Sequence, residues 1–554
     1  MVLPLLTQLL HLTKPDSKSK GCHIVGSPLL ERSGRVYIQP TTNIRLLKDV
    51  PLDTTYDHTI YFASKSAQYN YFVGLQKYNL TNYTYQRVKK GVARVGIKAD
   101  NLYDCNYMMF QNTAYGTKWF YAFITAVEFV NNECAEIYFE LDVMQTWFFD
   151  CEPDYCFIER EHTETDGIGE HIEPETVATG EYVMNNYSPI KYMTDMVVCI
   201  AIVDTNNDTD GTLYDGIYGS AQLWVYDSTD VDGINGKVNE YVQKPDAIIG
   251  MYMFPKIFIG GSIPDTHRLG YGGNATKTTV KLAGVSTDDT IDGYKPKNKK
   301  LYTYPYNFYH VDNASGSELS LRYEFFENNT PVVEISGTVT QPVIAILRPC
   351  SYKGVAGYTD LGGYTTLNTE SLQLNSYPMC SWNVDAYQAW VAQNAIPIAM
   401  NSVASVGQMG IAGAYSTNPN AVIGSGSIGL VSGLMSQFYQ ASIAADISKG
   451  NLNNGGGNVA NGKQQFYGGR CSVRKEYARM IDDYFTMFGY AVHRVKKPNR
   501  SSRPHWNYVK TVGATVTGSV PADDMRKICN IYDNGVTFWK KGSEVGQYNL
   551  DNTV

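Results

Sequence analysis

The sequence predicts a mainly β protein with many turns, on the basis of its composition and of several strand-like runs. Its 554 residues include 43 Tyr, 49 Gly and 22 Pro. Tyrosine favours strands, whereas Gly and Pro favour the turns that join them. A chain of this length is long enough for about two to four domains.

Individual strands are predicted by runs of β-branched and aromatic residues and by alternation of apolar with polar residues. Residues 120–130 form such a run, and residues 135–143 alternate in the manner of a half-buried strand. The polar residues 131–133 between them predict a hairpin turn. Further strands are expected at residues 319–327, 332–339 and 342–347.

One helix is predicted near the end of the chain. Apolar residues recur there at the spacing of a single helical face, namely Tyr477, Met480, Ile481, Tyr484 and Phe485. The predicted helix covers residues 473–488, and Gly489 should end it because Gly is favoured just after a helix.

The most unusual part of the sequence is residues 386–445, sixty consecutive residues without Lys, Arg, Asp, Glu or His. In a chain that is 18% charged, about eleven charges would be expected there. Small and polar residues are mixed with large apolar ones, which suits a segment that must exist in more than one environment. The residues expected to be membrane-active are Trp390, Ile396, Ile398, Met400, Met409, Ile411, Ile428, Leu430, Val431, Leu434, Met435 and Phe438.

The uncharged segment has an internal plan of two arms around a turn at residues 416–420. The second arm, residues 427–445, has helical periodicity and would be about 28 Å long, close to the ~30 Å core of a bilayer. Gly429 and Gly433 have the spacing that lets two helices approach closely in lipid. The Gly- and Asn-rich stretch that follows predicts a flexible hinge, with Gly455, Gly456 and Gly457 at its centre.

Three interpretations of the uncharged segment are open from its residues. It is a membrane-active hairpin that becomes exposed under some condition, a buried helical hairpin in a soluble core, or a permanent transmembrane span. The last is disfavoured, because no window of 18 residues is free of Ser, Asn, Gln and Gly, and because no Lys or Arg cluster marks a flank.

Charge and cysteine content exclude several classes of protein. The net charge of −8 argues against a protein that coats nucleic acid. One basic run near Trp506 is open to interpretation as a solvated surface, a subunit contact or a DNA contact; it comprises Arg494, Lys496, Lys497, Arg500 and Arg503. The ten Cys are scattered without a C-x-x-C pair, which is typical of free thiols in a reducing compartment. Residues 1–34 lack the pattern of a signal peptide and are expected to form an extension outside the fold.

Two motifs suggest small-molecule chemistry, and neither has the context that the chemistry needs. Residues 424–429 match G-x-G-x-x-G, but no βαβ alternation surrounds them. The second motif is a cluster of carboxylates and an imidazole that suggests metal binding or acid/base work, although a polar loop after a strand also explains it; its members are Glu159, Glu161, His162, Glu164 and Asp166. We therefore predict no catalytic residues, no metal and no cofactor.

Four runs of the sequence resemble the distal tail knob proteins of phi29-like short-tailed bacteriophages. They are Tyr107–Phe123, Phe139–Asp150, Arg494–Asn499 and Ile531–Trp539, and they stand in the order found in that family. The resemblance covers residues 37–161, 302–353 and 382–539, whereas residues 1–34 have no recognised counterpart and residues 162–300 diverge.

The resemblance implies a structural protein without an active site. Family members assemble as homo-hexameric tubes of β-barrel or β-sandwich domains at the far end of the tail, next to other tail proteins. Each subunit carries a long hydrophobic loop or helical hairpin, which aligns here with residues 386–445. These loops plug the tube and then open a path through lipid of the host cytoplasmic membrane. Double-stranded viral DNA would pass through the lumen without sequence-specific binding.

The domain organisation that follows has seven parts. An extension (1–34) precedes the first part of a tube domain (35–161), a divergent β-rich domain (162–300) and the second part of the tube domain (301–385). The membrane-active loop (386–445), the hinge (446–465) and the C-terminal part of the tube domain (466–554) complete the chain.

The expected location is the distal tail tip of the virion, and the host membrane during entry. Two alternatives remain, an adhesin that binds a receptor or wall polymer through residues 162–300, and a tail-borne hydrolase that uses the 159–166 cluster.

Overall fold

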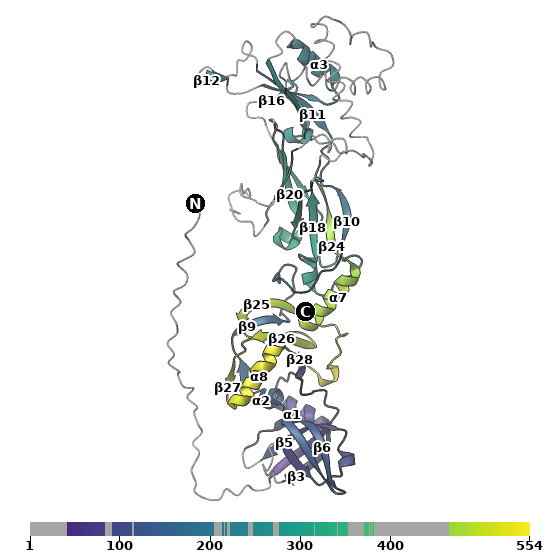
Figure 1. Ribbon diagram of the computed structural model, residues 1–554, viewed down its shortest axis with the longest axis vertical. Coiled ribbons are helices and arrows are strands. Elements are labelled where there is room, and N and C mark those ends of the chain that lie inside the picture. The colour runs from purple at the N-terminus through teal and green to yellow at the C-terminus, as the bar shows by residue number, and fades with distance from the viewer. Residues whose placement is uncertain are drawn as a thin grey trace. The chain divides into compact units, whose positions relative to one another are not determined.

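The computed structural model describes residues 41–83, 91–112, 116–203, 213–214, 217–218, 222–241, 247–269, 276–314, 316–340, 342–352, 371–375, 377, 379–381 and 465–554. The described residues are mainly β, which confirms the predicted fold class (Figure 1). The chain divides into two compact units, residues 1–49 with 75–141 (unit 1) and residues 50–74 with 142–554 (unit 2). The seven-part domain organisation expected from the sequence stays a prediction.

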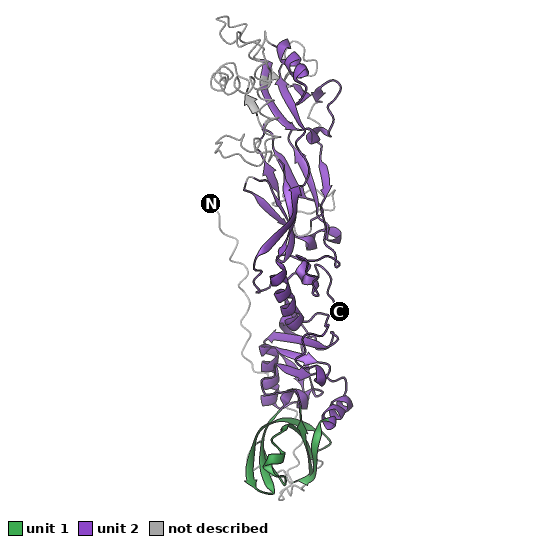
Figure 2. Ribbon diagram, turned by 90° about the vertical axis from the view of Figure 1, so that its right-hand side faces the viewer, with its two compact units in different colours: residues 1–49, 75–141 green, residues 50–74, 142–554 purple. Residues whose placement is uncertain are grey.

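Unit 1 is built on one antiparallel sheet of six strands in the order β3-β1-β5-β6-β7-β4, which curls around its own core (Figure 2). Ile44, Leu46 and Met108 point into this core and are at most 3% exposed. The predicted hairpin is confirmed, because β6 and β7 pair up to Asn131 and Cys134. The strands are β1 (Thr42–Lys48), β3 (Gln76–Tyr83), β4 (Val92–Val95), β5 (Cys105–Asn112), β6 (Phe120–Asn131) and β7 (Cys134–Leu141), with the 3-10 turn η1 (Ala99–Asn101).

One part of unit 2 is a five-stranded sheet in the order β2-β28-β26-β9-β25, which we call the β26 sheet. Helix α8 packs on it, and Thr511 Oγ1 donates a hydrogen bond of 2.7 Å to Asp533 of that helix. Trp506 and Trp539 are fully buried, with ring centroids 5.0 Å apart. The elements here are β2 (His58–Ile60), α1 (Lys65–Gly74), α2 (Val143–Trp147), β8 (Cys151–Pro153), β9 (Cys156–Glu161), β25 (Tyr490–Lys496), β26 (Trp506–Val512), β27 (Val516–Gly518), α8 (Ala522–Asn534), β28 (Val536–Trp539) and η9 (Gly542–Glu544).

A four-stranded antiparallel sheet of unit 2, the β24 sheet, has the order β10-β24-β18-β19. Its strands are β10 (Tyr182–Pro189), β18 (Asn307–Asp312), β19 (Glu318–Leu321) and β24 (Tyr467–Val473). Helix α7 (Lys475–Phe488) follows β24 and confirms the predicted helix, and Gly489 caps it by donating its N–H to Phe485 O at 2.8 Å. The predicted apolar face is wrong in one place: Met480 is 66% exposed, whereas Ile481 and Phe485 are buried.

Two further sheets complete unit 2, a five-stranded one (β16-β14-β11-β15-β23) and a four-stranded one (β17-β20-β21-β22). The strands predicted at 332–339 and 342–347 are confirmed as β20 and β21, whereas the strand predicted at 319–327 ends at Leu321 and continues as 3-10 turns. The bounds are β11 (Met196–Ile202), β12 (Leu213–Tyr214), β13 (Ile217–Tyr218), β14 (Gln222–Asp227), α3 (Val231–Glu240), β15 (Ile248–Pro255), η4 (Lys256–Ile259), β16 (Arg268–Leu269), β17 (Thr278–Lys281), η5 (Lys299–Tyr302), η6 (Tyr323–Phe325), η7 (Glu327–Asn329), β20 (Val332–Gly337), β21 (Ala345–Pro349), β22 (Leu372–Leu374) and β23 (Met379–Ser381).

The described strands that precede and follow the uncharged segment in the chain belong to two different sheets. β23 precedes it and pairs with β15, and β24 follows it and pairs with β10 and β18. Residues 386–445 themselves lie outside the described residues, as do Gly455, Gly456 and Gly457. Among the residues that the structure does describe, no helix has the length and hydropathy to cross a bilayer.

Candidate functional site

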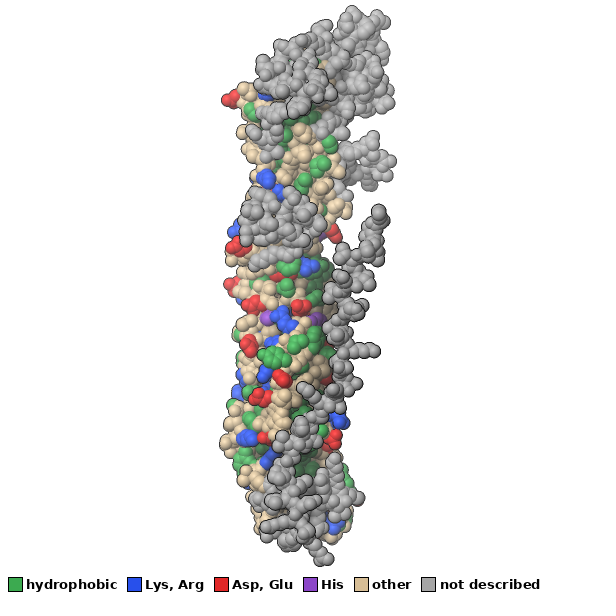
Figure 3. All heavy atoms as spheres, turned by 90° about the vertical axis from the view of Figure 1, so that its left-hand side faces the viewer, with side chains coloured by type: hydrophobic (Ala, Val, Ile, Leu, Met, Phe, Trp, Pro, Cys, Tyr) green, Lys and Arg blue, Asp and Glu red, His purple; other side chains and the backbone are tan. Residues whose placement is uncertain are grey.

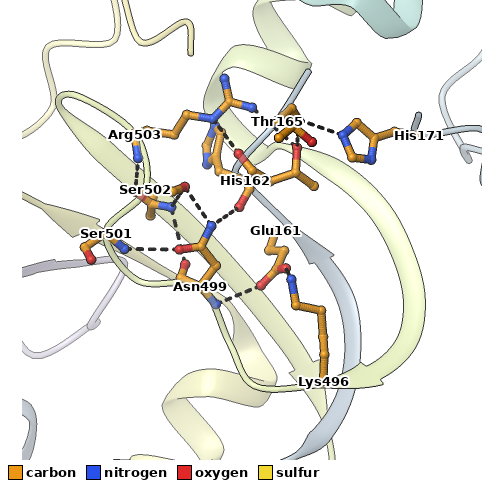
Figure 4. Close-up of polar contacts among 11 residues, drawn as sticks. Glu161, His162, Thr165, His171, Lys496, Asn499, Ser501, Ser502 and Arg503 are labelled. Carbon is orange, nitrogen blue, oxygen red and sulfur yellow. Dashed lines mark hydrogen bonds and ion pairs between the residues drawn. The ribbon is translucent and has the colours of Figure 1, made fainter. Parts of the chain in front are cut away.

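The polar cluster at the end of β9 is the one place in the described residues where the sequence suggested acid/base or metal chemistry (Figure 4). The Glu161 side chain is fully buried, and its carboxylate forms an ion pair of 2.5 Å with Lys496 Nζ. The same carboxylate accepts the backbone N–H of Asn499 at 2.9 Å. Glu161 therefore fixes the loop after β25, and its charge is neutralised inside the protein.

The ring of His162 is held between a helix and a strand. Its Nδ1 accepts the backbone N–H of Tyr508 at 2.8 Å, so Nε2 carries the proton and donates to the carbonyl of Thr486 at 3.0 Å. Burial, reinforced by the positive charges of Arg503 and Arg160, lowers the pKa of His162 to about 3. A neutral imidazole with both nitrogens engaged cannot act as a proton shuttle at neutral pH.

The remaining members of the cluster are either engaged in structural contacts or exposed. Asp166 accepts the hydroxyl of Tyr490 at 2.7 Å, and burial raises the pKa of its carboxyl group. Glu159 pairs with Lys510 at 2.8 Å, and Glu164 is exposed. The described residues contain no group of three or more His, Cys, Asp or Glu that could hold a metal ion. The polar side chains of the cluster bind neighbouring parts of the protein to one another, and their arrangement does not support the hydrolase alternative.

Side chains of the basic run make contacts within the chain. Arg503 is 2% exposed and donates from Nε to the carbonyl of Thr163 at 3.0 Å. Arg500 lies 5.6 Å above the ring of Phe148 as a cation–π pair. On the face shown in Figure 3, basic and acidic side chains of the described residues are interspersed rather than gathered by sign. These observations favour a structural role for the run over a DNA contact.

Two buried carboxylate networks, one of ion pairs around Glu175 and one of hydrogen bonds around Asp482, were not predicted from the sequence. Glu175 forms ion pairs with Arg160 and Lys300, and its carboxylate also accepts the N–H of Ala491 at 2.9 Å. The fully buried Asp482 binds residues of the 294–298 segment. The burial of Asp482 could have been predicted, because Asp482 stands next to Ile481 on the apolar side of the predicted helix. Nothing in the sequence indicated that Glu175 is buried.

The free edges of the β24 sheet are the described feature best suited to assembly. β10 pairs only with β24, and β19 pairs only with β18, within the part of the chain that the structure covers. Since all four strands are antiparallel to their neighbours, the two edge strands run in opposite directions. A copy related by rotation about an axis along the strands would bring its β19 antiparallel to β10 of the first copy.

Comparisons with known proteins agree with this architecture. Residues 274–553 match the family model of the Bacillus phage phi29 tail knob protein gp9, C-terminal domain, and residues 40–152 match that of the caudoviral major tail protein N-terminus. The tail knob protein gp9 of Bacillus phage phi29 is 26% identical over 93% of this chain and 98% of its own length, and that of Bacillus phage B103 is 28% identical over the same shares. The structure of the bacteriophage C1 tail knob protein, gp12, superposes with a TM-score of 0.55 at 15% identity, covering 91% of this chain and 97% of that one.

Fold and comparisons together define a structural protein of the bacteriophage virion tail, and not an enzyme. A protein of this class has other tail components as its neighbours. The chain belongs to the tail knob protein gp9 family, whose model covers half of it.

Proposed function

We propose that six copies of this chain form a tube at the distal end of the tail and that residues 386–445 first plug the tube and then enter the host cytoplasmic membrane. The channel so formed lets the genome leave the virion. The observation that carries the proposal is the absence of charge from those sixty residues. In this proposal the tube is assembled next to other tail proteins, as the family of the chain implies.

The physical basis of the membrane step is the differential cost of charged and apolar side chains in lipid. Moving a large apolar side chain out of water is worth about 1.5–3 kcal/mol. A single charge at the centre of a bilayer costs about 2.5–3.5 kcal/mol on insertion scales. The large apolar residues of 386–445 therefore favour insertion, and nothing charged in the segment opposes it.

Tube formation is supported by the edges of the β24 sheet. An exposed edge strand has unpaired N–H and C=O groups, which favour pairing with another chain. Tyr182 and Met184 on β10 are 42% and 40% exposed, so this edge also has apolar side chains available for a neighbour. A ring of copies related by one rotation would use the same pair of edges at each contact.

Passage of DNA is favoured by the charge of the chain. Each copy has a net charge of −8, and a tube of such copies repels the phosphate backbone instead of retaining it. Such repulsion acts on the phosphates of any DNA, so the passage of DNA would be independent of its sequence.

The test uses the full-length chain and dye-filled liposomes. The variant Val431→Lys/Met435→Lys adds two charges to the second arm and should abolish dye release while the tube still assembles. Val495→Lys/Met480→Lys is a matched control, because the same residue types are changed at sites that are 65% and 66% exposed. Dye release by the loop variant at the level of the control would refute the membrane step.

A further inference from the structure

His162 connects two structural parts of unit 2. It is the first residue after β9, where the chain leaves the β26 sheet and runs through residues 163–181 to β10 of the β24 sheet. Its backbone N–H donates to the carbonyl of Tyr508 at 3.1 Å, while its ring accepts the N–H of the same residue. Both polar groups of the Tyr508 backbone are thus bound by one residue.

The other side of the His162 ring is tied to α7. Thr486 O accepts the Nε2 proton at 3.0 Å and also accepts the indole N–H of Trp506 at 3.1 Å. A neutral ring with its proton on Nε2 satisfies both partners. A second proton on Nδ1 would point at the N–H of Tyr508, so that two donors would face each other across 2.8 Å.

Among the described residues, no charged group around the ring would stabilise the positive charge that a second proton brings to His162. Arg160 of β9 and Arg503 of the 497–503 loop both oppose a positive charge there. The neighbouring carboxylates are already engaged, Glu161 by Lys496 and Asp166 by Tyr490. From α7 and β26 the ring meets the Thr486 carbonyl and the Tyr508 backbone, neither of which titrates.

We infer that His162 is an acid-sensitive latch, in which protonation of Nδ1 detaches His162 from β26 and α7. The contact between His162 and Tyr508 then opens before the β26 sheet itself unfolds, because the rest of that sheet is held by ladder hydrogen bonds and by the Trp506 core. This inference concerns the connection between two sheets and is independent of the proposed membrane step.

The direction of the pH effect follows from linkage. The pKa of His162 is near 3 in the closed state and near its ordinary 6.5 once the ring is exposed. The stabilisation is therefore complete above about pH 6.5 and is lost as the pH falls toward 3. Between pH 7.5 and pH 5 the opening equilibrium should rise by about 30-fold.

Amide hydrogen exchange of the full chain, corrected for intrinsic pH dependence, tests the latch. In the native protein, the amides of Tyr508 and of residue 162, which hydrogen-bond each other's residues, should show the 30-fold rise, whereas His162→Gln should show no such dependence. A glutamine amide can donate to Thr486 and accept from Tyr508 but does not titrate. The exposed His493 provides the control His493→Gln, which should retain the native pH dependence.

Two outcomes would overturn the inference. One is an equal pH dependence in the native protein and in His162→Gln. The other concerns the native protein alone and holds even if the variant does not fold. Nitrogen chemical shifts of selectively labelled histidine should show a proton on Nε2 and none on Nδ1 at neutral pH, and the opposite tautomer would exclude the latch.

Discussion

Asn298 donates two hydrogen bonds to the same oxygen of the buried Asp482, one from its backbone N–H at 2.9 Å and one from its side-chain amide at 2.8 Å. The second carboxylate oxygen accepts from the Tyr294 hydroxyl and the Lys297 N–H, both at 2.7 Å. All four of these donors come from residues 294–298. Helix α7 is fixed in this way to a segment 184 residues earlier in the chain.

Asp482→Asn should lower the free energy of unfolding by at least about 2 kcal/mol, because its NH2 group would face at least one of these donors in place of an acceptor. Chemical denaturation of unit 2 would measure the change. The neighbouring Asp483 is exposed, so Asp483→Asn is the matched control and should have an effect within about 0.5 kcal/mol of zero. Equal effects of the two variants would contradict the role assigned to Asp482.

Glu175→Gln should cost about 3–5 kcal/mol, since it leaves the buried cations Arg160 and Lys300 without their shared anion. Burial already lowers the pKa of Lys300, and loss of Glu175 should lower it further. A lysine whose pKa is lower in the folded state destabilises that state while the lysine is charged, and this penalty falls as the pH rises through the folded-state pKa. The loss of stability caused by Glu175→Gln should therefore become smaller toward pH 10. Glu173 is 38% exposed and has a weaker effect on Lys300 than Glu175, so the control Glu173→Gln should cost much less than Glu175→Gln.

Gly489→Ala should prevent correct packing of the end of α7 against β9. The backbone of Gly489 has φ +65° and ψ −152°, a conformation that is essentially restricted to glycine, and a Cβ there would lie 2.2 Å from the carbonyl oxygen of Glu161. We expect a loss of more than about 3 kcal/mol, measured by thermal and denaturant unfolding. Gly513 also has positive φ but open space around it, so Gly513→Ala should cost only about 1–2 kcal/mol.

Met184→Lys, on the free edge β10, should weaken association between copies and leave the fold of each copy intact. Lysine on an edge strand opposes pairing with a second strand. We expect the concentration needed for assembly, measured by mass photometry, to rise by roughly tenfold, which corresponds to about 1.4 kcal/mol. Met480→Lys is the control on α7, and an equal shift in both variants would argue against the β24 sheet edge as the contact.

The parts of the fold that the sequence predicted are those encoded by local patterns. The hairpin of β6 and β7 follows from a β-branched run, an alternating run and a polar turn within about twenty residues, and α7 follows from its apolar spacing. Helix α8 was not predicted, because its few buried apolar residues, Ile528, Ile531 and Tyr532, are outnumbered by polar ones.

The polar sites were harder to predict because their partners are distant in sequence. The cluster at 159–166 has the composition of a reactive site, yet Glu161 and His162 are bound by residues more than 300 positions later. Sequence proximity shows which polar groups lie together, and only the tertiary structure shows which of them are neutralised. For the same reason the pairing of Glu175 with Lys300 had no local signal.

The position of β24 in its sheet has a consequence for synthesis of the protein. β24 lies between β10 and β18, and it follows residues 386–445 in the chain. The β24 sheet can therefore close only after the ribosome has released the whole uncharged segment, since domains form as their chain emerges. Newly made subunits pass through a stage at which sixty uncharged, partly apolar residues have left the ribosomal tunnel while β24 (Tyr467–Val473) is still inside it, so a holding chaperone should bind nascent chains at this stage.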